Sequence, residues 1–232
     1  MKSASEIIAE VKDILAARWQ ERDSKKVPEL EDLQLNSNDA MRLEGTVLYA
    51  DMVDSTGLVT GFKDWFAAKV YKAYLGAACH IIRNNSGAVT AFDGDRVMAV
   101  YRGDAPNSSA SKSALQISWA VKEINTAIKT TYPNTAFELQ QSIGIDTSDL
   151  FVTKTGIRGF NDLVWVGSAA NYAAKLAGGA GFSGGVFITE AVFSRLRDDA
   201  KYGGSPRRSM WEQLQWHATN KVIYRSNWTW EP

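Results

Sequence analysis

The sequence has 232 residues, of which 45% are hydrophobic, and this length suits one compact domain with terminal extensions. Basic and acidic residues both number 26, so the formal net charge is zero. This balance argues against proteins that hold nucleic acid or an anionic membrane mainly by bulk positive charge. The single cysteine, Cys79, excludes an intramolecular disulfide.

Residues 1–43 are expected to form a helix and a linker arm outside the main domain, which takes residues 44–232. Apolar residues recur at helical spacing over residues 5–21, which predicts an amphipathic helix with Ser5 as its N-cap. Residues 22–42 are polar and contain a proline, which indicates a linker. The chain shows neither a signal-peptide pattern nor a membrane-spanning one, so we expect a cytoplasmic location.

The main domain shows alternating strand and helix patterns. Their order is β-α-β-β-α-β, which predicts an α+β, ferredoxin-like sheet with helices on one face. Four of the eight tryptophans lie in a C-terminal extension over residues 211–230, where such a density of aromatic side chains indicates packing. The predicted strands are residues 46–50, 88–92, 97–101, 139–145, 150–153 and 163–166, and the predicted helices are residues 62–83, 110–128 and 169–176.

Two aspartates are expected to meet at one edge of this sheet. Asp51 ends the first strand, and Asp95 lies in the turn of the hairpin that follows the first helix. Converging carboxylates repel each other unless a cation lies between them, and oxygen ligands of this kind suit Mg²⁺ or Mn²⁺. Taken singly, each residue has a simpler reading, in which Asp51 caps a helix and Asp95 only makes the turn.

The segment after Asp51 carries groups that suit an anion. Its backbone N–H groups and hydroxyls lie close to a helix N-terminus, where phosphate binds favourably. No Gly-x-x-x-x-Gly-Lys-Ser/Thr sequence occurs, which disfavours a P-loop enzyme. The candidate phosphate-binding residues are Asp54, Ser55, Thr56 and Gly57.

A third segment places an amide and a cation on one helix. Asn171 and Lys175 are one turn apart and share a face. Together they suit a ribose and a negatively charged transition state. The simpler alternative is a solvated pair on an exposed helix.

Three segments together resemble the signature segments of class III adenylate and guanylate cyclases, in order and in spacing. They are YADMVDST at residues 49–56, FDGDRVMAVY at residues 92–101 and VWVGSAANYAAK at residues 164–175. The resemblance spans about residues 44–189. No single segment is specific, but the combination is.

The resemblance implies a head-to-tail homodimer with active sites at the interface. One subunit is expected to hold two divalent metal ions through Asp51, Met52 and Asp95. The other is expected to supply Asn171, which orients the ribose, and Lys175 in place of the arginine that the family usually has. Lysine keeps the positive charge but lacks the planar fork of arginine. A late-strand lysine usually binds the triphosphate, and Lys221 is the candidate here.

The base pocket departs from that of purine cyclases. Ala91 and Val164 stand where the family places residues that read a purine, and neither side chain forms hydrogen bonds. Tyr49 and Arg96 are expected to narrow and polarise the pocket, and Arg96 is able to donate to uracil O2 or O4. The combination resembles the pyrimidine cyclases of bacterial antiphage systems, which signal to a separate effector.

We therefore expect conversion of UTP to 3′,5′-cyclic UMP and pyrophosphate. The alternatives are a cytidylate cyclase, an adenylate or guanylate cyclase, and a non-catalytic dimer of the same fold that binds a nucleotide. An RNA-binding ferredoxin-like domain is disfavoured, because the strands lack the required aromatic stacking pair and the charge is neutral.

Overall fold

The computed structural model describes residues 2–179 and 181–232, which group into two compact units. Unit 1 takes the N-terminal residues through Glu44 together with Asp149–Gly167. Unit 2 takes Gly45–Ser148 and the residues from Ser168 onward. Within the described residues, no helix is both long and apolar enough to cross a bilayer.

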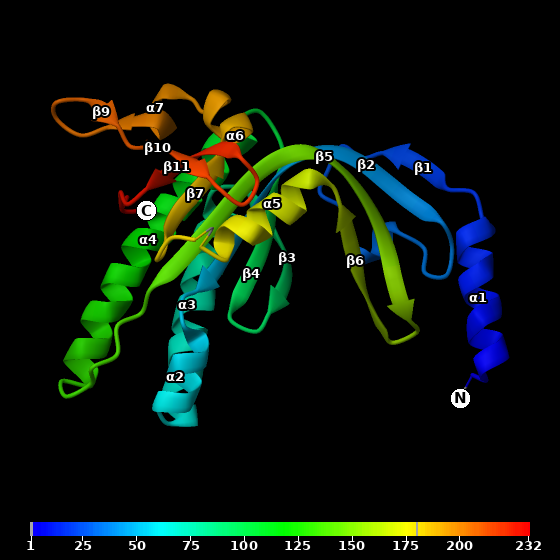
Figure 1. The fold of residues 1–232 in the computed structure, drawn as a ribbon, viewed down its shortest axis with the longest axis horizontal. Coiled ribbons are helices and arrows are strands. Elements are labelled where there is room, and N and C mark those ends of the chain that lie inside the picture. Colours follow the sequence, from blue (N-terminus) through cyan, green and yellow to red (C-terminus); the bar gives the residue numbers. More distant parts are fainter. Residues whose placement is uncertain (1, 180) are drawn as a thin grey trace. The chain divides into compact units, whose positions relative to one another are not determined.

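A mixed sheet forms the centre of unit 2, with the strand order β10-β11-β7-β5-β2-β4-β3 (Figure 1). β5 and β7 run parallel, whereas β3 with β4, β2 with β4, β7 with β11 and β10 with β11 are antiparallel pairs. β5 is one continuous strand where the sequence predicted two. β7 and β10 were not predicted, and β11 was expected only as the late strand that carries Lys221. The strands are β2 (Asp39–Met52), β3 (Gly87–Asp93), β4 (Arg96–Tyr101), β5 (Gln141–Ile157), β7 (Gly185–Thr189), β10 (Glu212–Trp216) and β11 (Lys221–Ser226).

Two long helices cover one face of this sheet, and a shorter helix packs on the other. α3 (Asp64–Asn84) and α4 (Pro106–Thr131) share the main apolar core with Ile143 and Ile145 of β5. Side chains alternate along a strand, so Gly144 faces the opposite side. There α5 (Ser168–Ala177) approaches so closely that a Cβ on Gly144 would lie 2.1 Å from the carbonyl oxygen of Ala173.

Shorter elements complete unit 2. A separate helix α2 (Ser55–Gly61) precedes α3, whereas the sequence predicted one helix from residue 62. Three of the four tryptophans of the C-terminal extension pack as expected, because Trp211 and Trp216 are buried and Trp228 packs partly buried against the core, whereas Trp230 is exposed. The remaining elements are α6 (Glu190–Ser194), α7 (Asp198–Lys201) and the strand pair β8 (Tyr202–Gly203) and β9 (Arg208–Ser209).

Unit 1 contains α1 (Ala4–Ala16), β1 (Gln20–Asp23), the 3-10 helix η1 (Leu30–Asp32) and β6 (Phe160–Val166), which pairs with β5. The prediction that Ser5 caps the helix was wrong. Ser3 is the N-cap, because its hydroxyl and the carboxylate of Glu6 form a reciprocal capping box. The helix also ends earlier than predicted. The amide of Asn38 donates to carbonyls of its last turn, and β1 follows as a strand parallel to β2.

Candidate active site

An ion pair joins the ends of β2 and β4. The register places Ala50 opposite Val97, so the next residues along, Asp51 and Arg96, meet across the strands. Nη2 of Arg96 lies 2.7 Å from Oδ2 of Asp51, and Nε lies 3.1 Å from the same oxygen. Arg96 also faces Asp93 of β3. The guanidinium therefore lies between two acidic residues.

The second acidic candidate, Asp95, lies in the two-residue turn between β3 and β4. Gly94 takes φ 61° there, a conformation that residues with a side chain rarely adopt. Oδ2 of Asp95 is buried and has no hydrogen-bond partner among the described residues. Burial raises the pKa of Asp51 and the charge of Asp95 adds to this rise, while the hydrogen bond from Arg96 lowers it. The two carboxylates therefore interact electrostatically, as the sequence predicted from their positions.

This pair fits a divalent metal ion. The unpartnered Asp95 oxygen is a hard ligand with no donor to satisfy it, and a buried carboxylate of this kind is stabilised by a cation. No group of three or more acidic, histidine or cysteine side chains that could hold a metal occurs within the described residues. The Met52 side chain is buried in the core, and its thioether is too soft for Mg²⁺, so only its carbonyl suits the predicted role. Asp51 and Asp95 would therefore hold the ion, with further ligands from backbone, water or substrate.

The predicted phosphate segment forms the start of α2. Asp54 takes the left-handed conformation with φ 55° and caps this helix, because its carboxylate accepts a hydrogen bond of 3.2 Å from the Gly57 N–H. Ser55 and Thr56 lie in the first turn. A cavity of about 290 Å³ borders Asp54 and Gly57. Phosphate binding by the Gly57 N–H therefore requires the Asp54 carboxylate to move aside.

The predicted ribose and transition-state residues lie elsewhere in unit 2. Asn171 and Lys175 are exposed, while Ala169, Ala173 and Leu176 on the other face of α5 are buried against the sheet. The pair thus points away from the sheet that carries Asp51. This orientation makes both side chains accessible to another molecule.

Lys221 begins β11, and its ammonium lies 4.4 Å from the centre of the Tyr172 ring. β7 and β5 separate β11 from β2. Three strand spacings place the two strands on the order of 14 Å apart. The structure therefore does not bring Lys221 close to Asp51 within one chain.

A row of three side chains crosses the sheet beside the Asp51–Arg96 pair. Tyr49 on β2 and Ala91 on β3 both lie opposite Met98 of β4. The Arg96 guanidinium is 6.0 Å from the centre of the Tyr49 ring, and burial raises the pKa of this tyrosine. Sequence reasoning missed Met98, although it shares a face with Arg96 two residues earlier. The buried Met98 side chain therefore lies between Tyr49 and Ala91 in the sheet.

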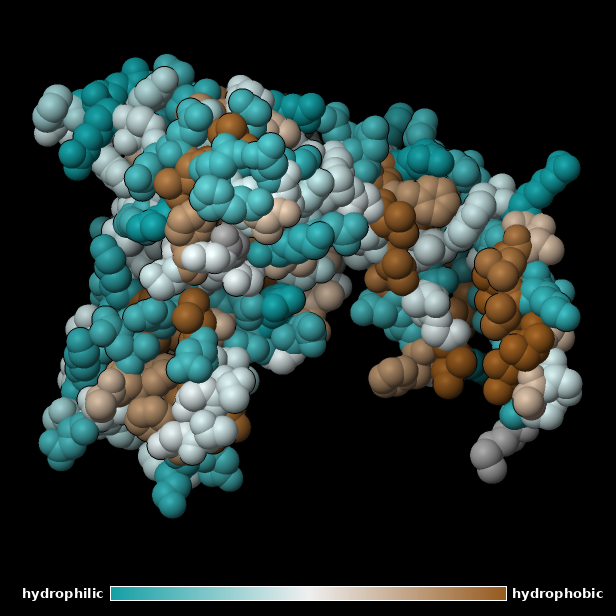
Figure 2. All heavy atoms as spheres, in the orientation of Figure 1, coloured by the Kyte–Doolittle hydropathy of each residue, from teal (hydrophilic) through white to brown (hydrophobic). Residues whose placement is uncertain are grey.

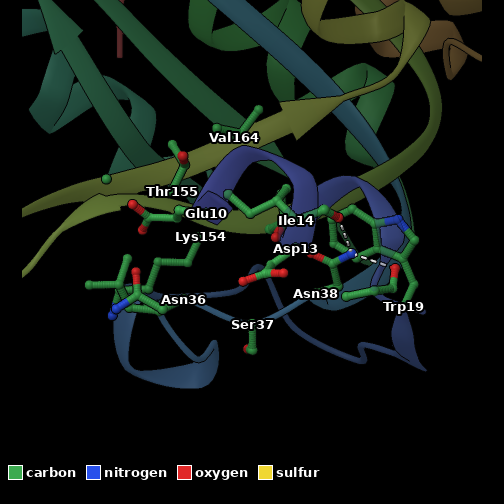
Figure 3. Close-up of a pocket in the computed structure, with 14 residues that line it drawn as sticks. Glu10, Asp13, Ile14, Trp19, Asn36, Ser37, Asn38, Lys154, Thr155 and Val164 are labelled. Carbon is green, nitrogen blue, oxygen red and sulfur yellow. Dashed lines mark hydrogen bonds between the residues drawn. The ribbon is translucent and has the colours of Figure 1, made fainter. Parts of the chain in front are cut away.

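Val164, the fourth predicted base-pocket residue, belongs to unit 1. It is 37% exposed and lies on β6, opposite Thr153. It lines a cavity of about 510 Å³ with side chains of α1 and β5, among them Glu10, Asp13 and Lys154 (Figure 3). Within unit 1 its surroundings are therefore this mixed polar and apolar cavity.

Several curated bacterial proteins are similar to this chain over nearly their full length. A uridylate cyclase from Xanthomonas perforans is 47% identical over 220 residues, which cover 94% of each chain. A uridylate cyclase from Burkholderia cepacia is 42% identical over 231 residues, which cover 99% of each chain. No protein-family model matches the sequence.

Solved cyclase structures share the fold. The crystal structure of a guanylyl cyclase matches with a TM-score of 0.67 and 20% identity, covering 82% of this chain and 95% of that one. The adenylyl cyclase CyaB from P. aeruginosa matches with a TM-score of 0.64 and 18% identity, covering 81% and 95%. At such low sequence identity, the similarity to these structures establishes the fold alone.

Proposed function

The chain belongs to the uridylate cyclase family, and from this premise we propose that it closes UTP into 3′,5′-cyclic UMP and pyrophosphate. Family membership and the class III fold confirm the predicted α+β nucleotide cyclase. The observation that supports UTP as the substrate is the similarity of the chain to uridylate cyclases. The row of Tyr49, Met98 and Ala91 supplies a physical basis for it.

This row suits a small base. Ala91 and Met98 offer no side-chain hydrogen bond to the polar edge of a purine, and an unsatisfied buried polar group costs about 1–3 kcal/mol. Arg96 carries five N–H donors, and its Nε and Nη2 groups donate to Asp51. The remaining N–H groups are able to donate to a uracil carbonyl at the same time. Cytosine presents an amino donor that arginine cannot accept. UTP is thus favoured over CTP, ATP and GTP.

The reaction is an in-line displacement at the α-phosphorus. The 3′ oxygen of the ribose forms a bond to this phosphorus, the bond to pyrophosphate breaks, and the 3′ hydroxyl proton goes to solvent. Two divalent ions, Mg²⁺ or Mn²⁺, would lower the pKa of the hydroxyl and neutralise the triphosphate when bound. Asp51 and Asp95 would hold them, and the carbonyl of Met52 is the third candidate ligand. Asp54, Ser55, Thr56 and Gly57 are the candidates for the triphosphate.

The positions of the remaining groups support catalysis by a homodimer. Asn171 and Lys175 point away from the sheet that carries Asp51, and Lys221 lies several strands away from it. A second subunit would bring these groups to the metal-binding edge of the first. One subunit then contributes the metal carboxylates, and its partner orients the ribose and stabilises the charge on phosphorus.

The surface of unit 1 supports association with a second copy. Of the fifteen exposed large apolar side chains among the described residues, ten belong to this unit. Apart from Trp19, which follows α1, they form a stripe along α1 and a patch on the β5–β6 hairpin (Figure 2). Apolar surface gathered in this way is typical of protein–protein contacts. The ten are Ile7, Ile8, Val11, Ile14, Leu15, Trp19, Ile157, Phe160, Val164 and Val166.

We further propose that cyclic UMP is a cytoplasmic second messenger in bacterial antiphage defence. The support is the resemblance of the Tyr49 and Arg96 pocket to antiphage pyrimidine cyclases, whose product acts on a separate effector. Cells that carry the enzyme and its effector should survive phage challenge, whereas cells carrying Asp51→Asn should not. Equal survival of both would contradict the signalling role but not the cyclase activity.

Incubation with each of the four ribonucleoside triphosphates and Mn²⁺, with products identified by mass, tests the reaction. We expect cyclic UMP and pyrophosphate as the main products, with a minor product from CTP. A main product from CTP would make the enzyme a cytidylate cyclase, and one from ATP or GTP would refute the pyrimidine assignment. Nucleotide binding without pyrophosphate release would favour the non-catalytic dimer, for which Lys175 in the usual arginine position is the supporting observation.

Replacing Tyr49 by alanine should weaken the choice of base. The half-buried ring narrows the pocket beside Arg96, so its removal gives a purine room to enter. We expect the ratio of kcat/KM for UTP to that for ATP to fall roughly tenfold or more, as for the loss of one or two pocket contacts. The Mn²⁺ concentration that gives half-maximal activity should stay the same. An unchanged ratio would mean that Tyr49 does not set specificity.

A further inference from the structure

The core of unit 2 contains a buried tyrosine hydroxyl, that of Tyr74, without a hydrogen-bond partner in the described structure. Tyr74 lies on α3 and is 1% exposed. Leaving such a group unpaired costs about 1–3 kcal/mol, which phenylalanine at this position would avoid. A tyrosine here is therefore unfavourable for packing alone.

An unpaired acceptor lies in the turn of the β3–β4 hairpin, and both strands of this hairpin contact α3, the helix that carries Tyr74. Val97 and Ala99 of β4 pack in the same core cluster as Tyr74. Oδ2 of Asp95 is also buried and without a partner in the described part of the chain. One hydrogen bond between the two side chains would satisfy both groups.

Electrostatics agree with this placement. Burial raises the pKa of Tyr74 well above its usual value, and the carboxylates of Asp51 and Asp95 raise it further. The phenol is therefore close enough to both acidic residues to sense their charge.

We propose that Tyr74 is a positioning residue of the metal site, whose hydroxyl donates a hydrogen bond to the Asp95 carboxylate when Asp95 binds a divalent cation. This inference rests on the proposed function, because it takes Asp95 to be a metal ligand. Groups that hydrogen-bond to metal ligands fix their orientation, and their loss typically weakens metal binding about 10- to 100-fold. Tyr74 would act through Asp95 and need not touch the substrate.

Tyr74→Phe and Tyr101→Phe form a matched pair for the test. Tyr101 is also 1% exposed and belongs to the same core cluster, and its hydroxyl lies beside Ser113 and not beside an acidic residue. It lies six residues further along β4 than Asp95. Each variant removes one buried hydroxyl, but only Tyr74→Phe removes one beside the carboxylates. Two quantities are measured on the purified full chain: the Mn²⁺ dissociation constant by titration calorimetry, and the thermal unfolding midpoint without metal.

We expect Tyr74→Phe to weaken Mn²⁺ binding roughly 10- to 100-fold while the metal-free unfolding midpoint stays the same or rises. Tyr101→Phe should leave Mn²⁺ binding unchanged. Wild-type affinity in Tyr74→Phe, or equal weakening in both variants, would overturn the proposal. A lower metal-free midpoint in Tyr74→Phe would also overturn it, because the hydroxyl would then be structural.

Asp95→Asn separates this inference from the proposed function. If Asp95→Asn loses Mn²⁺ binding and Tyr74→Phe retains it, the metal site stands and the role of Tyr74 falls. If the wild-type protein and Asp95→Asn behave alike toward Mn²⁺, the metal assignment itself falls, and the positioning role falls with it.

Discussion

Asp95→Asn is expected to abolish Mn²⁺-dependent formation of the cyclic nucleotide while leaving the fold intact. Asparagine keeps the shape of the side chain but removes the charge that would hold the cation. Metal catalysis contributes several kcal/mol, so we expect a loss of about a thousandfold or more. Because Oδ2 of Asp95 has no donor within the described structure, the metal-free unfolding midpoint should stay the same or rise.

Asp51→Asn should cause a similar loss of activity, together with a small loss of stability. This variant weakens the ion pair with Arg96, whose side chain is 32% exposed. Asp93→Asn is the matched control, because Asp93 lies in the same hairpin and also faces Arg96 but is exposed. It should retain activity within a few-fold, measured as pyrophosphate release under saturating Mn²⁺. Cyclization at the wild-type rate in either Asp51→Asn or Asp95→Asn would contradict the metal assignment.

Local sequence patterns were sufficient to predict which acidic residues lie at the edge of the sheet where we propose a metal site. A Gly-Asp turn between two apolar runs predicts a hairpin, and the structure has this hairpin with Asp95 in its turn. The apolar run that stops at Asp51 predicted a strand just as directly. Pairing of β2 with β4 then brings the two acidic residues to one edge. Such features depend on neighbours along the chain, which a sequence displays directly.

Register between distant strands could not be predicted in the same way. Arg96 was expected in the base pocket, but its contact with Asp51 depends on which residues of β2 and β4 face each other. The positions of Met98 and Tyr74 beside the candidate site were missed for the same reason, because in the sequence each looks like an ordinary core residue. Their surroundings depend on strand and helix packing over many residues of separation. The domain boundary near residue 44 stays a prediction, although the structure groups the hairpin at 149–167 with the N-terminal segment.

Mixing two inactive variants should restore part of the activity if the site is shared between subunits. Asp51→Asn lacks a metal ligand, and Asn171→Ala lacks the residue that orients the ribose. In a heterodimer of the two, one site carries both defects, while the other joins an intact Asp51 to an intact Asn171. With free exchange of subunits in equal amounts, half of the dimers are mixed, so about one quarter of wild-type activity should return.

A second mixture makes this result specific to a composite site. Asp51→Asn combined with Asp95→Asn should give no rescue, because both defects lie in the half-site of one subunit and every site in the heterodimer then lacks one carboxylate. Subunit exchange is verified by native mass spectrometry of differently tagged chains, and activity is measured as cyclic UMP formed from UTP. A site built within one chain predicts no rescue in either mixture. Rescue in both would mean that Asp51 and Asp95 serve different sites, whereas rescue only with Asn171→Ala would place α5 of one subunit over the carboxylates of the other.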